Sequence, residues 1–476
     1  MKLIPLLLVF LIASCSHLDR APSSTETIYS KFSPRTGKEA FDIIYDRISN
    51  AKKYVYVTIY SWSEVSLDNA LAAACTNGAE VKVAIHSDLF KTAATKKRME
   101  ELESKCVEFK KTAKKSHVKF TIVDDIFLVN TSANFSSKAH STYNESFVFF
   151  EGKELDIKYS SILSQFKKEF SNIWNSSSDY LSKDDKVSDK IIFDFDEGKD
   201  LEVNMISSTE NFEFLENPKI EQAQKDGIYS VLKRKYNKKI KTEVVKEAVL
   251  NEINKAKKSI YLNVNHFVHK DLADAILKRA KDDGIEVKIV ADNQEYSPKS
   301  TKLLVSYMAR EWLKLFPGQN PPIRFKYYSF LPNIRFSQMN HNKTIIIDHE
   351  TKNPVLITGS YNFSDTAENT QFDNLVFYHG KSFIELTKTF VDDFYYLWDY
   401  GRGDESVLLT AEKSFAAEDA VYVHTKKPIS LDWFEIQALQ KHIQKKYGFP
   451  FNQYKNMRDC SVYIVSKKKF AGCLPK

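Results

Sequence analysis

The pattern of apolar and polar residues occurs twice along the chain. Residues 51–60 (AKKYVYVTIY) match residues 256–265 (AKKSIYLNVN), and in both a helix-end pattern leads into an apolar run typical of a buried strand. An amphipathic segment follows each run, at residues 67–74 and 272–280. The two halves are therefore predicted to begin with the same strand and helix.

Each predicted helix is followed by a glycine and a second apolar run. Gly78 and Gly284 suit the end of a helix, because glycine readily adopts the left-handed conformation found there. Residues 81–85 and 287–291 then indicate a second strand. A helix between two strands allows them to lie parallel, so the pattern predicts strand, helix and parallel strand in both halves.

A second pair of matching segments lies further along. Residues 166–174 (FKKEFSNIW) and 390–398 (FVDDFYYLW) have an apolar period of about 3.6, which predicts helices with Trp174 and Trp398 in the core. The first pair is offset by 205 residues and this pair by 224, so the second copy has a longer connection, which we place around residues 299–338. The chain is predicted to be a duplicated α/β protein.

Changes in composition divide the chain into parts. Residues 183–202 mix Asp, Lys and Ser, as linkers do, and an insertion at roughly 214–241 precedes the first strand of the second copy. No repeat is found after about residue 401, where we expect a helix at residues 431–447 and a hairpin closed by two cysteines. The predicted parts are a leader (1–14), a first domain (15–182), a linker (183–202), a second domain (203–400) and an extension (401–476).

The composition is that of an ordinary globular protein. Of 476 residues, 43% are hydrophobic and 28% charged, with only 13 Gly and 13 Pro, which excludes a collagen-like or largely disordered chain. The net charge of +7 is small for this length, so it does not by itself indicate nucleic-acid binding.

The first residues have the layout of a signal peptide. Lys2 precedes an apolar run at residues 3–13, which is too short to span a bilayer. The sequence Ile-Ala-Ser before Cys15 resembles the lipobox of bacterial lipoproteins, which implies an acylated Cys15 as the first residue of the mature chain. We expect a bacterial cell-envelope lipoprotein facing the periplasm or the exterior. The alternative is an ordinary secretory signal with an incidental cysteine.

Four cysteines remain besides Cys15, and an oxidising compartment favours disulfides between them. Pairing Cys75 with Cys106 and Cys460 with Cys473 keeps each bond within one local unit, although other connectivities and free thiols remain open. The chain contains neither a CxxC nor an HExxH motif, so we expect no metal site and no cofactor.

Two segments share the pattern H-x-K-x4-D. They are His117, Lys119 and Asp124 in the first half, and His341, Lys343 and Asp348 in the second. In an extended strand the histidine and lysine of each motif project from the same face. Together, two lysines and two imidazoles would form a site for an oxyanion, with tetrahedral phosphorus the natural candidate, and the imidazoles can act as nucleophile and proton donor.

Each motif is followed by a polar cluster and then by an acid at the start of an apolar strand. The clusters are residues 131–136 (TSANFS) and 359–364 (GSYNFS), and the acids are Glu145 and Asp373.

These features resemble the two HKD motifs of the phospholipase D superfamily, and the resemblance extends over about residues 27–400. It implies two α-β-α sandwich domains related by a pseudo-twofold axis, and a covalent phosphohistidine. His117 would be the nucleophile and His341 the acid, with the reverse open. Glu145 and Asp373 would each orient the histidine of the other half, and Asp124 and Asp348 would be structural. The phosphate oxygens would be held by Lys119, Lys343, Ser132, Ser360, Asn134 and Asn362.

Two positions depart from the family pattern. Thr131 replaces a glycine, and we expect it to narrow the approach of the backbone to the phosphate. Asp373 is one methylene shorter than the usual glutamate, so we expect its contact with a histidine to be longer or mediated by water.

The substrate is less well defined by the sequence. Residues 359–364 resemble the branch with secreted endonucleases and cardiolipin hydrolases more than the cardiolipin synthases, which favours hydrolysis over phosphatidyl transfer. The basic runs at 110–115 and 233–241 would contact anionic lipid or nucleic acid, or are simply solvated. Membrane anchoring favours a phospholipid substrate in the bilayer. An endonuclease, a phosphatidyltransferase and an inactive binding or scaffold protein are the alternatives, and no obligate protein partner is expected.

Overall fold

A computed structural model describes residues 28–86, 89, 92–112, 114–152, 160–179, 202–213, 237–239, 243–297, 300–315, 323–328, 338–400 and 430–437. The predictions for the leader, Cys15, Cys460 and Cys473 lie outside these residues. Most of the predicted linker and extension also lies outside them.

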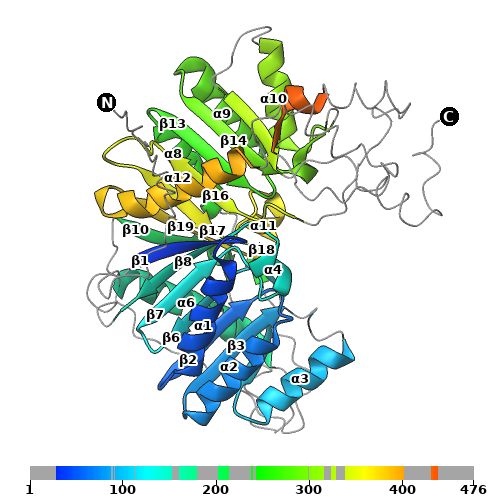
Figure 1. The fold of residues 1–476 in the computed structure, drawn as a ribbon, viewed down its shortest axis with the longest axis vertical. Helices are drawn as coiled ribbons and strands as arrows, with labels where there is room; N and C mark the ends of the chain where they lie inside the picture. Colours follow the sequence, from blue (N-terminus) through cyan, green and yellow to red (C-terminus); the bar gives the residue numbers. More distant parts are fainter. Residues whose placement is uncertain are drawn as a thin grey trace, which may run out of the picture.

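The first half forms one mixed sheet with helices, in the blue to cyan part of Figure 1. Its strand order is β1-β8-β7-β6-β2-β3-β4-β9. The elements are β1 (Ile28–Ser33), α1 (Gly37–Ser49), β2 (Tyr54–Ile59), α2 (Val65–Thr76), β3 (Glu80–His86), α3 (Ala93–Glu103), β4 (Glu108–Thr112), β5 (Lys115–Ser116), β6 (Phe120–Val123), β7 (Phe127–Thr131), α4 (Ser137–Ser141), β8 (Glu145–Glu151), α6 (Ser160–Ser176) and β9 (Ser178–Asp179).

The second half, in green to orange, builds its sheet in the equivalent order β10-β19-β17-β16-β13-β14-β15-β20. The elements are β10 (Val203–Ser207), η2 (Ser208–Asn211), β11 (Phe212–Glu213), β12 (Asn237–Lys239), α8 (Val244–Lys255), β13 (Ser259–Val264), α9 (Lys270–Asp282), β14 (Glu286–Asp292), η3 (Asn293–Glu295), α10 (Leu304–Leu315), β15 (Ile323–Tyr328), β16 (Lys343–Ile347), β17 (Val355–Gly359), α11 (Asp365–Asn369), β18 (Gln371–Phe372), β19 (Asn374–His379), η4 (Lys381–Phe383), α12 (Ile384–Trp398) and β20 (Leu431–Asp432). The shared order confirms the predicted duplicated α/β fold.

The predicted strand, helix and parallel strand occur in both halves. β2 pairs in parallel with β3, and β13 with β14. Gly78 and Gly284 end the intervening helices with φ of +83° and +66°, a conformation that other residues adopt only at a steric cost.

Helices α6 and α12 join the two halves through a shared hydrophobic core. Their residues Trp174 and Trp398 belong to one buried cluster that also contains Tyr56 from the first sheet and Tyr261 from the second. The predicted core positions of both tryptophans are confirmed. Because both sheets bury one face against this cluster, the halves pack as one unit.

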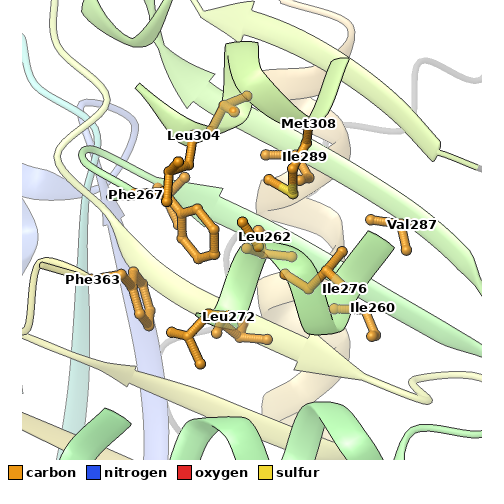
Figure 2. Close-up of a cluster of buried hydrophobic side chains, with 14 of the residues drawn as sticks. Ile260, Leu262, Phe267, Leu272, Ile276, Val287, Ile289, Leu304, Met308 and Phe363 are labelled. Atoms are coloured by element: carbon orange, nitrogen blue, oxygen red, sulfur yellow. The ribbon is translucent and has the colours of Figure 1, made fainter. Parts of the chain in front are cut away.

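Each sheet has a second core on its outer face. In the second half, Ile260 and Leu262 of β13 pack against Leu272 and Ile276 of α9 and against Met308 of α10, as Figure 2 shows. A separate cluster in the first half has the same arrangement around α1 and α2. Each half is therefore a sheet between two helical layers, as the α-β-α prediction requires.

The long connection expected at residues 299–338 contains regular structure. It holds α10 and β15, which occupy the places of α3 and β4 in the first half. The expected helix at 431–447 begins later than predicted, because Leu431 and Asp432 form β20 beside β15. A segment from beyond residue 400 thus completes the second sheet.

The predicted disulfide between Cys75 and Cys106 is present, with a Cα separation of 5.6 Å. It connects α2 to the turn that follows α3.

The motif aspartates are structural, as expected. Asp124 accepts hydrogen bonds from the backbone N–H groups of residues 52–54 at 2.6–2.8 Å. Asp348 does the same for residues 257–259 at 2.6–3.1 Å. Both have φ of +53°. Each carboxylate therefore ties the turn after its motif strand to the chain that enters the central strand of its sheet.

Replacing Asp124 by Ala should strongly destabilise the protein, because three backbone donors lose their acceptor. Each unsatisfied donor costs about 1–3 kcal/mol, so we expect a loss of at least about 3 kcal/mol in the free energy of unfolding, measured in urea. Asp42→Ala is the control, because it removes an exposed carboxylate whose partner is Lys38. A loss at Asp124 as small as that of the control would contradict the structural role.

Candidate active site

The two motif histidines meet in the centre of the molecule. The ring centroids of His117 and His341 lie 6.3 Å apart, with the rings at 82° to one another. Neither histidine lies within a regular strand, although the prediction placed both there. His117 lies between β5 and β6, and His341 lies two residues before the start of β16.

Backbone hydrogen bonds between the halves hold both histidines. The N–H of His117 donates to the carbonyl of Phe372 at 2.8 Å, where β5 and β18 form a short parallel pair. The N–H of His341 donates to the carbonyl of Asn144 at 2.9 Å. In each case the acceptor residue directly precedes the acid of the opposite half. This register brings each histidine to the acid of the other half.

The acids contact the histidines directly. Nδ1 of His117 lies 2.8 Å from Oδ1 of Asp373, and Nδ1 of His341 lies 2.8 Å from both carboxylate oxygens of Glu145. The predicted pairing between halves is therefore what the structure shows. The expected longer or water-mediated contact of Asp373 was wrong. A carboxylate at Nδ1 stabilises the tautomer protonated there, which leaves Nε2 available for chemistry.

Both motif lysines are buried beside the histidines. Lys119 donates to the carbonyl of His117, and Lys343 to the carbonyl of His341. Burial lowers the pKa of Lys119 well below its usual value, and the charge of Lys343 lowers it further. Burial lowers the pKa of Lys343 to about 8, an effect that Glu145 opposes. An anion bound beside both ammonium groups would reduce the repulsion between them.

Burial also shifts the pKa values of the histidines and of one acid. The pKa of His117 falls well below 6.5, through burial and then the charges of Lys119 and Lys343. The pKa of His341 falls to about 4, mainly through burial. Burial raises the pKa of Asp373 to about 7, against the effect of Lys119. An anionic phosphate beside the imidazoles would favour their protonated forms, so substrate binding would itself prepare one of them as an acid.

The two predicted serines contact the acid-bearing strands. Ser132 donates to Oε2 of Glu145 at 2.6 Å, and Ser360 donates to Oδ1 of Asn374 at 3.3 Å. Both serines are fully buried. These hydroxyl groups therefore position the acids or their strands, whereas the prediction gave them to the phosphate.

The two predicted asparagines are equivalent in the two halves. The Oδ1 atoms of Asn134 and Asn362 are buried, and neither has a hydrogen-bond partner among the described residues. Their role in holding phosphate oxygens stays a prediction.

Thr131 is accommodated without obstructing its own loop. Its hydroxyl donates to the carbonyl of Ser146 at 2.7 Å and accepts from the N–H of Ala133, so its side chain is directed at β8. The equivalent Gly359 has no such room, because a Cβ there would lie 2.5 Å from the carbonyl oxygen of Asn374.

Sequence reasoning missed Gln371, whose side-chain amide donates to Oδ2 of Asp373. Gln371 is buried, and it donates to Asp373 as the hydroxyl of Ser132 donates to Glu145. Its position two residues before the acid was the available signal, since alternate residues of an extended segment share a face. Two further serines were missed: Ser33 and Ser208 accept from the N–H groups of Glu145 and Asp373.

A family model described as the PLD-like domain of cardiolipin synthase matches residues 44–174 and 249–398, more than half of the chain. The chain therefore belongs to the phospholipase D superfamily, whose members are phosphodiesterases and phosphotransferases. No curated protein matches it.

Several solved structures are similar. The phospholipase D family member Nuc from Salmonella typhimurium is 22% identical, with a TM-score of 0.29 over 33% of this chain and 98% of Nuc. Phosphatidylserine synthase from Haemophilus influenzae is 13% identical, with a TM-score of 0.48 over 78% of this chain and 86% of the synthase. Polyphosphate kinase from Porphyromonas gingivalis is 12% identical, with a TM-score of 0.46 over 83% of this chain and 50% of the kinase.

Replacing Gln371 by Leu should move the acid limb of the pH profile of kcat/KM to higher pH. The amide donor favours the ionised form of Asp373, which must be ionised to accept the Nδ1 proton of His117. Its loss raises the pKa of Asp373 further above the usual range, by about one unit, since a hydrogen bond to a charged group contributes about 1.5 kcal/mol.

Tyr143→Phe is the matched control, because Tyr143 occupies the position equivalent to Gln371 while Ser132 serves the acid of that half. Its acid limb should not move. Equal loss of activity at every pH in Gln371→Leu, with an unmoved limb, would reduce Gln371 to a packing role.

Proposed function

We propose that the protein is a phospholipase D-like phosphodiesterase, which hydrolyses glycerophospholipids at a membrane surface through a covalent phosphohistidine. The observation that carries the proposal is the pair of facing imidazoles, each held at Nδ1 by the acid of the opposite half. Two buried lysines beside them supply the positive charge that a pentacovalent phosphorus needs.

In the first step, Nε2 of His117 attacks phosphorus and the bond from phosphorus to the alcohol oxygen breaks. His341 donates its Nε2 proton to the departing oxygen. In the second step, His341 takes a proton from water, the resulting hydroxide attacks phosphorus, and the phosphorus–nitrogen bond breaks. This releases the phosphate monoester and restores neutral His117. His117 is assigned as nucleophile from its position in the first motif, and burial lowers the pKa of both imidazoles, so the neutral form needed for attack is favoured at either one.

Lys119 and Lys343 balance the charge on the phosphoryl oxygens in both steps. The side-chain NH2 groups of Asn134 and Asn362 are proposed as further donors to those oxygens, since the two residues occupy equivalent positions in the polar clusters that follow the two motifs. Asp373 and Glu145 stabilise each imidazolium as it forms. Each group therefore acts where charge changes during the reaction.

A phospholipid substrate is supported by the predicted acylation of Cys15, which would confine the site to a bilayer in the cell envelope. No helix in the described part of the chain is long and apolar enough to cross a membrane. The basic run at 110–115 contributes less than the sequence indicated, because Lys110 is buried against the ring of Trp174. Lys115 is the exposed lysine of this run.

Phosphatidyl transfer is the second candidate, because the matching family model is described as a cardiolipin synthase domain. The same phosphohistidine would then be attacked by an alcohol in place of water. An endonuclease would also use the same two steps.

Alanine at His117 or His341 should lower kcat by several orders of magnitude, because each removes a reacting group. With a phosphodiester whose leaving group needs no proton, such as bis(p-nitrophenyl) phosphate, His341→Ala should still accumulate a phosphoenzyme at His117. Mass spectrometry of the quenched enzyme locates the adduct.

His379→Ala is the control, since this histidine is partly exposed and faces Glu252. An adduct at residue 341 in the His117 variant would reverse the two roles. No adduct in either variant would contradict covalent catalysis.

The substrate is tested with unlipidated protein on phosphatidylcholine vesicles, phosphatidylserine vesicles and single-stranded and duplex DNA, all in excess EDTA. Phosphatidic acid should form in the vesicles and the headgroup alcohol should be released, since histidine and lysine carry the proposed chemistry without a metal ion. Adding glycerol separates the second candidate, because a transferase would yield phosphatidylglycerol. DNA cleavage that depends on His117, without lipid cleavage, would overturn the lipid assignment. Loss of all activity in EDTA, restored by a divalent ion, would overturn the mechanism.

A further inference from the structure

The pseudo-twofold symmetry of the active site is broken beside His117. Three positions that correspond in the repeat hold different residues in the two halves. The pairs are Tyr60 and Asn265 after the first central strand, His86 and Asp292 at the end of the next strand, and Lys115 and Met339 two residues before the motif histidine. The first half thus has an aromatic and two basic residues where the second has neutral and acidic ones.

On the side of His117, the other residues lie around the ring of Tyr60. The ring of Tyr60 meets that of His117 edge-on at 5.4 Å and stacks on that of His86 at 5.3 Å. The ammonium groups of Lys115 and Lys119 lie 4.9 and 5.8 Å from its centroid. Tyr60 is half-buried and Lys115 exposed, whereas His117 and Lys119 are buried. Lys115 therefore extends the positive region of the active site outward to solvent, with the ring of Tyr60 between it and the buried residues.

On the second side, the equivalent residues are used inside the protein. The amide of Asn265 donates to the carbonyl of Asn340 at 2.8 Å, and Asp292 accepts from the N–H of Asn340 at 2.8 Å. Both side chains are buried and hold the residue that precedes His341. They offer no group to a ligand, so the two ends of a substrate meet different surroundings.

We propose that Tyr60, His86 and Lys115 form a subsite for a second anionic group of the substrate, a phosphate or carboxylate near the scissile phosphate. The hydroxyl of Tyr60 has no hydrogen-bond partner among the described residues, so it can donate to such a group. Lys115 is exposed and adds a charged donor, and the imidazole of His86 packs against the ring of Tyr60. This inference rests on the proposed function. If the substrate is a phospholipid, the subsite makes the enzyme prefer an anionic headgroup over a zwitterionic one.

An anion fits this subsite better than a stacked nucleobase. The ring of Tyr60 already contacts the imidazole of His86 and the ammonium groups of two lysines. A base would have to displace these groups to stack, whereas an anion needs only the hydroxyl of Tyr60 and the ammonium group of Lys115.

The subsite is tested by competition in the hydrolysis of bis(p-nitrophenyl) phosphate, with glycerol 1,3-bisphosphate and glycerol 1-phosphate as inhibitors. Lys115→Met and Tyr60→Asn copy the residues of the second half. Each should weaken the bisphosphate roughly 3- to 10-fold relative to the monophosphate, as expected for one charge-assisted hydrogen bond near solvent. Lys278→Met, at an exposed position on α9, should leave the ratio unchanged. Equal weakening of both inhibitors in Lys115→Met and Tyr60→Asn would overturn the subsite.

A second arm separates this result from the proposed function. Dihexanoyl phosphatidylserine and phosphatidylcholine are supplied as dissolved monomers, so that no membrane surface charge contributes. Wild type should have the lower KM for phosphatidylserine, and Lys115→Met should raise that KM alone. Hydrolysis of neither lipid would overturn the proposed function, and the inhibitor ratio would then decide the subsite by itself. Equal KM values for both lipids in wild type would overturn the preference for anionic headgroups.

Discussion

The active site depends on two backbone hydrogen bonds that cross between the halves. His117 donates to Phe372 and His341 to Asn144, and in each pair the acceptor precedes an acid. A shift of one residue in this pairing would turn the acids to the opposite face, because alternate residues of an extended chain point in opposite directions. The geometry of the site is thus a consequence of how the two sheets pack around α6 and α12. Either half alone holds one motif histidine and the acid that contacts the histidine of the opposite half.

Burying these charges is costly, and the site offsets the cost by pairing them. Each imidazole has a carboxylate, and each lysine a carbonyl. Burial nevertheless lowers the pKa values of both lysines and both histidines, and the charge of a neighbouring lysine adds to this shift for Lys119, His117 and His341. A bound anion such as a phosphate would oppose this shift, because it stabilises the charged forms.

The duplicated halves have diverged while keeping the reacting groups. Asp373 is shorter than Glu145 yet reaches its histidine at the same 2.8 Å, and the amide of Gln371 holds its second oxygen. Ser132 performs that task in the other half. Beside His117 the divergence goes further, since Tyr60, His86 and Lys115 are replaced by neutral or acidic residues at the equivalent positions near His341. Such differences allow a symmetric catalytic core to act on a substrate with two unequal ends.

The sequence by itself determined the duplication and the strand and helix order, which follow from periodicity and spacing, local properties of the chain. The structural role of Asp124 and the reacting roles of His117 and His341 came from the resemblance of the two H-x-K-x4-D motifs to the phospholipase D superfamily, and the reacting roles stay predictions. Tertiary structure alone decided that Ser132 serves an acid, that Gln371 supports Asp373, and that Lys110 is buried against Trp174. Each of these contacts depends on how elements pack against one another in the folded chain. Local sequence pattern does not specify such contacts, because they arise only when the sheets and helices meet.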